Sequence, residues 1–379
     1  MIGRFVLSEI EIPADKNLIV LLAKRPGVTS FSSLKIVKKS LGTKKIGHTG
    51  TLDSFAQGLL VCCAGGLTRL AGSITEFDKT YEAVIEFGIE TDTLDPTGAV
   101  VKNAPLPTLF SFLKSLEKFR GKLKQTPPAF SAIKIGGERA SDILRKGGGV
   151  EIPCREIFVY DWELKEVQFE DDELRAVSCK TFGENFRIEI EKDLSRKIKF
   201  ARVEFRVSKG TYIRSLARDI GADCKSAAHL AGLLRTKVGA FSLGDAAFCE
   251  TLAPFTIQNV VRGLERDSAS CDVDMDFAAK EILQKSQRMS PDLARACGLG
   301  VAVLKAERTE DFFHGRPMKE NCFASLQKDF QTDCAAKELG DIKEASFERY
   351  AVFLRNGEFA GVVQKGFGHF NYEFVMAKA

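Results

Sequence analysis

Apolar positions in the first 120 residues switch between the spacings of strands and helices. The continuous run LIVLL at 18–22 indicates a buried strand. We expect Ser30 to cap the helix that follows and Gly42 to end it. The same patterns predict a strand at 58–65, a helix at about 67–77, a half-buried strand at 81–87, and an amphipathic helix marked by Leu109, Phe112, Leu113 and Leu116.

In the middle of the chain, apolar and polar residues alternate in two runs between 186 and 207, one through Phe186, Ile188 and Ile190 and one from Ala201 to Val207. This pattern predicts antiparallel strands with one solvent-facing side. A helix is expected to open near Thr211 and to stop at Gly221. Strands and helices mix without a regular βαβ rhythm. The predicted class is therefore α+β, with a large, mainly antiparallel mixed sheet flanked by helices.

Beyond about residue 250 the pattern weakens, and Lys319–Glu348 is polar. Strand character returns at 350–354, and a hairpin turn is expected at Asn356-Gly357. A chain of 379 residues is expected to hold more than one domain. We therefore expect a large domain at 1–250, a helical connection at 251–289, and a small β-rich domain at 290–379.

The composition is 44% hydrophobic and 28% charged, as in soluble globular proteins. No 18-residue apolar run is present, and the N-terminal residues MIGRFVLSEIEIPADK do not form a signal peptide pattern. We expect a cytoplasmic protein that does not associate with a membrane. The ten cysteines are scattered without metal-ligand spacing, which predicts buried thiols and no metal site.

The net charge of +4 is too small to indicate a partner, but the charges are unevenly distributed. From Lys16 to His48 there are eight basic residues and no acidic one. From Lys192 to Arg218 nine basic residues accompany only two acids. Both segments could face a phosphate backbone; each taken alone is better explained as a solvated surface, and a shared face would reverse that preference.

The segment 45–58, KIGHTGTLDSFAQG, is the most informative part of the chain. Glycines and threonines surround His48 and precede one acid, so the segment forms a tight polar loop before a buried strand. This places Asp53 on a rigid edge. Spacing alone favours a structural role, in which Asp53 caps a turn and His48 bonds the backbone.

Four further motifs accompany GHTGTLD in a fixed order. They are LLAKRPGVTS at 21–30, TPPAFSAIKIGGERA at 126–140, SKGTYIRSLARDIG at 208–221, and HLAGLLRTKVGAF at 229–241. Together they resemble the bacterial TruB-type pseudouridine synthases, which make pseudouridine 55 in the T loop of tRNAs. The resemblance spans about residues 17–250. It departs from the family pattern at Ala23-Lys24-Arg25, usually Asp-Lys-Pro, and at Ser54 and Val61, where prolines are usual.

The resemblance implies the pseudouridine synthase fold, with an RNA-embracing thumb at about 124–152. The stretch at 164–200 is longer than the family pattern and suggests an inserted hairpin. The tail resembles a PUA-like RNA-binding domain only loosely.

The resemblance also implies a site. Asp53 corresponds to the catalytic carboxylate, Arg214 to a guanidinium that keeps it ionised, and Tyr81 to a tyrosine that stacks on the uracil and accepts a proton. The resemblance places His48 against the extruded RNA and Tyr212 and Leu233 around the uracil. Contacts with the RNA backbone are expected from Lys24, Lys44, Lys45 and Lys209.

The implied reaction is redox-neutral, so no cofactor is expected. The expected partner is the T arm of tRNA, and the expected state is a monomer. Two alternatives remain: a tRNA-binding or RNA-folding module with incidental catalysis, and a synthase of the same family that modifies another RNA. The complete set Asp53, Tyr81 and Arg214 favours the enzyme, because a binding module needs no buried carboxylate.

Overall fold

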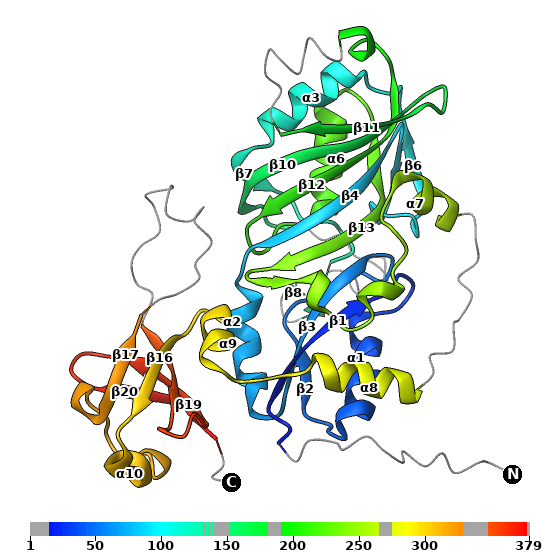
Figure 1. Cartoon of the computed structure of the whole chain (residues 1–379). Helices are drawn as coiled ribbons and strands as arrows, with labels where there is room; N and C mark the ends of the chain where they lie inside the picture. Colours follow the sequence, from blue (N-terminus) through cyan, green and yellow to red (C-terminus); the bar gives the residue numbers. More distant parts are fainter. Residues whose placement is uncertain are drawn as a thin grey trace, which may run out of the picture.

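The computed structural model describes residues 15–131, 134–135, 138–139, 152–180, 191–264, 275–328 and 348–376 (Figure 1). The first strands are β1 (Leu18–Lys24), β2 (Ile46–His48), β3 (Gln57–Ala64), β4 (Lys79–Phe87), β5 (Ile89–Thr91), β6 (Val100–Asn103), β7 (Gly121–Gln125), β8 (Lys134–Ile135) and β9 (Glu138–Arg139). The later ones are β10 (Arg155–Phe169), β11 (Leu174–Cys179), β12 (Ile198–Val207), β13 (Ala228–Val238), β14 (Phe241–Ser242), β15 (Gln287–Arg288), β16 (Gly300–Leu304), β17 (Phe323–Gln327), β18 (Arg349–Phe353), β19 (Phe359–Lys365) and β20 (Phe370–Val375).

The α-helices are α1 (Ser30–Leu41), α2 (Ala71–Thr75), α3 (Leu109–Lys118), α6 (Ile213–Asp223), α7 (Ile257–Leu264), α8 (Met275–Lys285), α9 (Pro291–Ala296) and α10 (Thr309–Phe313). A 3₁₀ helix at Gly65–Leu70 leads into α2, so the helix expected at 67–77 is built from two short pieces. Within the described ranges, no helix combines the length and apolarity that a bilayer crossing requires.

An 11-stranded sheet forms the centre of the molecule, in the order β11-β10-β12-β4-β13-β3-β1-β15, with β14, β2 and β7 attached beside this path. β13 runs parallel to β3, and the other described neighbours in this sheet are antiparallel. The predicted α+β class with a large, mainly antiparallel mixed sheet is therefore confirmed.

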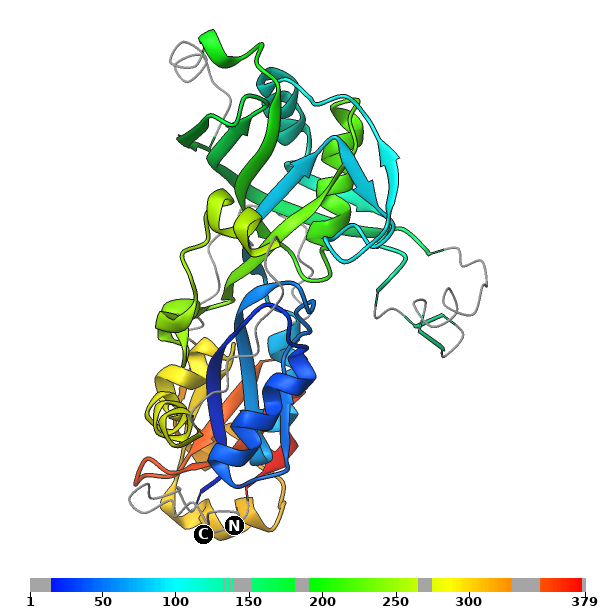
Figure 2. The same cartoon turned by 90° about the vertical axis from the view of Figure 1, so that its right-hand side faces the viewer.

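Two apolar cores pack against different parts of this sheet. Under β4, β10, β12 and β13 the core is completed by α3 and α6, through side chains such as Phe112 and Leu216. Under β1 and β3 it is completed by α1 and α8, through Leu34 and Ile282. Figure 2 shows the two parts following one another along the length of the molecule. Strand β13 contributes to both cores, with Leu230 and Leu233 in the first and Val238 in the second.

A second, five-stranded sheet follows, in the order β17-β16-β18-β19-β20. Its Phe353 and Phe374 belong to the same core as β1 and β3, and Nη1 of Arg349 donates to Ser73 Oγ at 2.5 Å. The expected hairpin is present, because β18 pairs antiparallel with β19 across a loop in which Gly357 has φ of 85°. The small β-rich C-terminal part is thus confirmed. Its PUA-like character and the residue boundaries of the domains stay predictions.

Two expected helix boundaries are wrong. Thr29, not Ser30, caps α1, since its side chain accepts from the Ser32 N–H. Gly221 does not end its helix, because α6 continues to Asp223. A Cβ at position 221 would lie 2.6 Å from Ala228 Cβ, so this glycine permits close packing of α6 on β13. Gly42, in contrast, ends α1 in the left-handed conformation as expected, with φ of 61°.

Several expected features fall partly outside the described residues. They include most of the thumb at 124–152, the alternating residues 186–190, and the larger part of the polar stretch at 319–348. The described part of the stretch at 164–200 does contain a hairpin, in which β10 pairs antiparallel with β11. Among the described cysteines, the expectation of buried thiols is wrong for Cys154, which is exposed, and for Cys224 and Cys249, which are only partly buried.

Candidate active site

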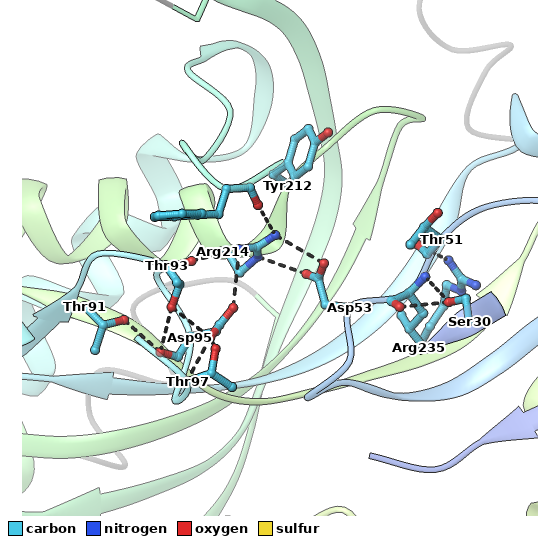
Figure 3. A network of polar contacts seen from close by, with 12 residues as sticks. Ser30, Thr51, Asp53, Thr91, Thr93, Asp95, Thr97, Tyr212, Arg214 and Arg235 are labelled. Carbon is cyan, nitrogen blue, oxygen red and sulfur yellow. Dashed lines mark hydrogen bonds and ion pairs between the residues drawn. The ribbon is translucent and has the colours of Figure 1, made fainter. Parts of the chain in front are cut away.

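The carboxylate of Asp53 faces the guanidinium of Arg214 (Figure 3). Asp53 lies in the loop between β2 and β3, and Arg214 lies in the first turn of α6. Nε of Arg214 is 2.9 Å from Asp53 Oδ2, and Nη2 donates to Oδ1 at 3.2 Å. Two contacts from one planar group to one carboxylate fix both the distance and the orientation of the pair.

Further contacts hold Arg214 from behind. Its Nη1 donates to the Thr93 carbonyl at 2.8 Å and to Asp95 Oδ2 at 3.4 Å, and its Nη2 donates to the Phe130 carbonyl at 3.1 Å. The side chain of Arg214 is only 6% exposed. A guanidinium with this many fixed acceptors cannot rotate freely, so it presents a fixed charge to Asp53.

Asp95 is itself held by a ring of threonines in the loop between β5 and β6. Its Oδ1 accepts from Thr93 Oγ1 at 2.9 Å and from the N–H and hydroxyl of Thr97 at 3.0 and 2.6 Å. Thr91 Oγ1 donates to the Asp95 carbonyl at 2.8 Å. Arg214 therefore lies between two carboxylates, of which Asp95 is buried and saturated and Asp53 faces the pocket.

Burial raises the pKa of Asp53 above its ordinary value, although the neighbouring charge of Arg214 opposes this shift. The negative charge of Asp95 raises the pKa further, and Lys24 lowers it. The ionisation of Asp53 thus depends on a balance between desolvation and its cationic neighbours.

The loop that carries Asp53 is anchored on both sides. Ser30 Oγ donates to the Leu52 carbonyl and accepts from the Leu52 N–H, both at 2.8 Å. The guanidinium of Arg235 donates to the carbonyls of Leu59, Thr51 and Gly50 at 2.8, 3.5 and 3.2 Å. These contacts link the loop to α1, β3 and β13 and make it rigid.

A pocket of about 320 Å³ opens in front of Asp53. Tyr81 of β4 and Leu233 of β13 form its apolar wall, 9% and 5% exposed. Tyr212, at the N-cap position of α6, lies at the rim, where the guanidinium of Arg155 lies 5.3 Å from its ring centroid. The structure thus brings together Asp53, Arg214, Tyr81, Leu233 and Tyr212 around one cavity.

The remaining candidates lie elsewhere. His48 is half-buried in β2 and is absent from the described lining; its Nδ1 accepts from the Gly50 N–H at 3.3 Å. Burial lowers its pKa, and the charge of Arg235 lowers it further. Lys44 and Lys45 are exposed near it, and exposed Lys209 forms an ion pair with Glu76.

Lys24 does not fit its expected contact with an RNA backbone. It is 1% exposed, and its Nζ donates to the carbonyls of Arg25, Val28 and Ser54 at 2.9, 2.7 and 3.3 Å. Desolvation lowers its pKa to about 8. Lys24 therefore supports the segments beneath Asp53 from the interior.

Asp95, Arg235 and Lys79 were not identified from the sequence. Lys79 is 8% exposed and lines the pocket from β4, two positions before Tyr81. Only the concentration of threonines around Asp95 could have drawn attention to its loop. Among the described residues, no group of three or more His, Cys, Asp or Glu side chains is placed to hold a metal ion.

Comparison with known proteins places this geometry in a family. Residues 38–182 match the profile described as "TruB family pseudouridylate synthase (N terminal domain)". A protein of Treponema denticola named tRNA pseudouridine synthase B is 44% identical over 323 residues, covering 83% of this chain and 87% of the relative. The protein of that name from Treponema pallidum (strain Nichols) is 35% identical over 377 residues, covering 95% and 97%.

Solved structures support the fold. The protein in "Crystal Structure of a Cbf5-Nop10-Gar1 Complex" superimposes with a TM-score of 0.56 at 18% identity, covering 95% of this chain and 85% of the other. A chain from "Structure of H/ACA RNP bound to a substrate RNA containing 2'-deoxyuridine" gives 0.55 at 16% identity, covering 99% and 98%.

Proposed function

The chain belongs to the TruB family of pseudouridylate synthases, and from this premise we propose that it converts a uridine at position 55, in the T loop of tRNA, to pseudouridine. The relatives named tRNA pseudouridine synthase B support tRNA as the substrate, since the similarity extends over most of both chains. The resemblance of the five motifs supports the T loop.

The observation that carries the proposal is the pairing of Asp53 with Arg214 at a pocket lined by Tyr81 and Leu233. Isomerisation of uridine breaks the bond between C1′ and N1, turns the uracil, and forms a bond from C1′ to C5. The proton on C5 is lost and N1 gains one, so no electrons are exchanged with a cofactor. An ionised carboxylate beside the nucleoside can start this sequence.

Three routes use Asp53 in this way: attack at C1′, addition at C6, and removal of the 2′ proton. Each requires Asp53 to be ionised when the RNA covers the site, and the charge of Arg214, which lowers the pKa of Asp53 against desolvation, supports this. Arg214 supplies the countercharge. Because these contacts fix the position of Arg214, little reorganisation is needed when the charge on Asp53 changes during the reaction.

The target base must leave the loop of the RNA before it can reach Asp53, at a cost of roughly a few kcal/mol. Tyr81 offers a ring on which the extruded uracil can stack, and Leu233 closes the opposite apolar contact. Tyr81 is also the proposed acceptor of the C5 proton. His48, in β2 just before the loop that carries Asp53, is the proposed contact for the RNA next to the position that the flipped base leaves.

The test is to incubate the purified protein with a tRNA transcript and to map pseudouridine by carbodiimide-dependent stops of reverse transcription. We expect one new stop, at the T-loop uridine, and none in a transcript carrying cytidine there. Tight tRNA binding with no stop would identify a binding module instead. A stop at another position would show that the substrate specificity proposed here is wrong.

A further inference from the structure

The described lining of the pocket holds two chemically different sets of residues. Asp53, Tyr81 and Leu233 belong to the set proposed above to act on the base and sugar. The other set consists of one cation, Lys79, together with hydroxyl and glycine residues, namely Thr75, Ser208, Gly210 and Thr211. Asp53 is the one carboxylate among the described lining residues, so the second set carries positive charge without an acid.

The strand register places Lys79 at a defined distance from the uracil wall. Lys79 and Tyr81 are two positions apart on β4, so both side chains face the pocket with a separation of about 6.8 Å along the strand. Arg235 is the cross-strand partner of Tyr81 on β13 and faces the same side. In a nucleotide, the ribose separates the base from the phosphate by a distance comparable to the separation of Tyr81 and Lys79. A nucleotide whose base stacks on Tyr81 can therefore place its phosphate near Lys79.

The charges of Lys79 and Arg235 are only partly balanced by carboxylates, since burial, the largest effect, lowers the pKa of Lys79 and the nearby Asp78 and Glu76 raise it against that effect. Lys79 Nζ donates to the carbonyls of Thr75 and Phe77, both at 2.5 Å, and Arg235 donates to three carbonyls. Neither lies within ion-pair distance of an acid in the described part of the chain. Nearby Glu76 is paired with Lys209. Lys79 keeps one N–H donor, and a buried cation with a free donor favours binding of an anion.

We propose, on the basis of the proposed function, that Lys79 binds a phosphate flanking the target uridine. The nearby positive charge of Arg235 strengthens the attraction for this phosphate. The site would recognise the flipped nucleotide by its backbone, independently of the base. Lys79 also contacts carbonyls at the end of α2, and a purely structural role there is the competing explanation.

The experiment replaces each phosphate flanking the target uridine by a neutral methylphosphonate in a T-arm hairpin RNA. Single-turnover kcat/KM is then measured for the full-length parent, Lys79→Met, Lys79→Arg and Lys237→Met. Lys237 is the matched control, because it is exposed and pairs with Thr80, which faces away from the pocket. Modification of the unaltered hairpin by the parent establishes the proposed function before any phosphate is changed.

We expect one replacement to lower kcat/KM of the parent by about 10- to 100-fold, the value of one hydrogen bond to a charged group. On the unaltered RNA, kcat/KM of Lys79→Met should be lower than that of the parent by a similar factor. Replacing the phosphate should then lower kcat/KM of this variant by less than about a further 2-fold, because the effects of removing the two partners of one contact are not additive. Lys79→Arg should recover part of the loss, and Lys237→Met should behave as the parent.

Two results would overturn the proposal. One is a parent that tolerates both replacements, which would leave no phosphate for Lys79 to bind. The other is a Lys79→Met variant that still shows the full penalty for the neutral phosphate, which would show that Lys79 only stabilises the end of α2.

Discussion

Nε of Arg214 lies 2.9 Å from Oδ2 of Asp53, although 161 positions separate the two residues in the chain. The arginine side chain is 6% exposed and the aspartate side chain 35%. The countercharge therefore comes from the protein interior, and the carboxylate is open towards the pocket. Asp95 contacts Arg214 on the side away from Asp53 (Figure 3), is buried, and is not among the described residues that line the pocket.

Replacing Asp53 by Asn should abolish isomerisation while tRNA binding is kept. The amide preserves the shape of the side chain but can serve neither as nucleophile nor as base, so the rate should fall by at least about 10³-fold. Binding by filter retention and single-turnover mapping of pseudouridine are the two measurements. Pseudouridine formation above contamination by this variant would remove Asp53 from its assigned role.

Replacing Arg214 by Met should move the acid limb of the pH profile to higher pH. Arg214 lowers the pKa of Asp53 against desolvation, so its loss raises this pKa further and protonates the carboxylate over a wider range. Activity should fall most at low pH, and Arg214→Lys should recover only part because it loses the planar fork. Single-turnover rates at saturating protein give the profile. An unchanged acid limb would contradict the pairing.

Replacing Asp95 by Asn should move the same limb in the opposite direction. The charge of Asp95 raises the pKa of Asp53, so removing it lowers that pKa and extends the ionised range to lower pH. The maximal rate should still drop by about 10-fold, because Arg214 loses one of its acceptors. Both effects appear in one pH profile. A limb displaced to higher pH would show that Asp95 acts in some other way.

Removing Lys44 and Lys45 together should flatten the salt dependence of tRNA binding. Both side chains are exposed, and each phosphate contact contributes about 0.7–0.9 to the slope of log affinity against log salt. The double alanine variant should lose about 1–2 from this slope and keep its single-turnover rate at saturation. Lys114 and Lys118, exposed on α3, provide the control pair. An equal slope in parent and variant would show that the two lysines are merely solvated.

Replacing Gly221 by Ala should destabilise the fold, although the position is helical. The new Cβ would lie 2.6 Å from Ala228 Cβ, and overpacking of this kind costs about 1–3 kcal/mol. Gly263→Ala in α7 is the matched control, since nothing lies within 4 Å of its added methyl. It should stabilise by about 0.5–1 kcal/mol. Urea denaturation measures both, and equal effects would refute the packing explanation.

The sequence by itself determined the elements with strong local periodicity. The apolar spacing of α3 and the alternation of β12 correctly predicted a helix and a strand, because both patterns depend on neighbours within a few residues. Local chemistry was less decisive at boundaries. Thr29 and Ser30 are both good caps, and only the folded chain shows that Ser30 is needed to hold Leu52.

The tertiary structure decided which charged residues share the site and which are buried. From the sequence, Lys24 belonged to a basic segment, yet its ammonium donates to two carbonyls of its own segment and to the Ser54 carbonyl next to Asp53. Arg235 contacts the loop that carries Asp53 only because β13 folds beside that loop, and Asp95 contacts Arg214 only because the loop after β5 folds against α6. Ion pairing and desolvation depend on distances of a few ångströms between residues far apart in sequence, so periodicity cannot reveal them.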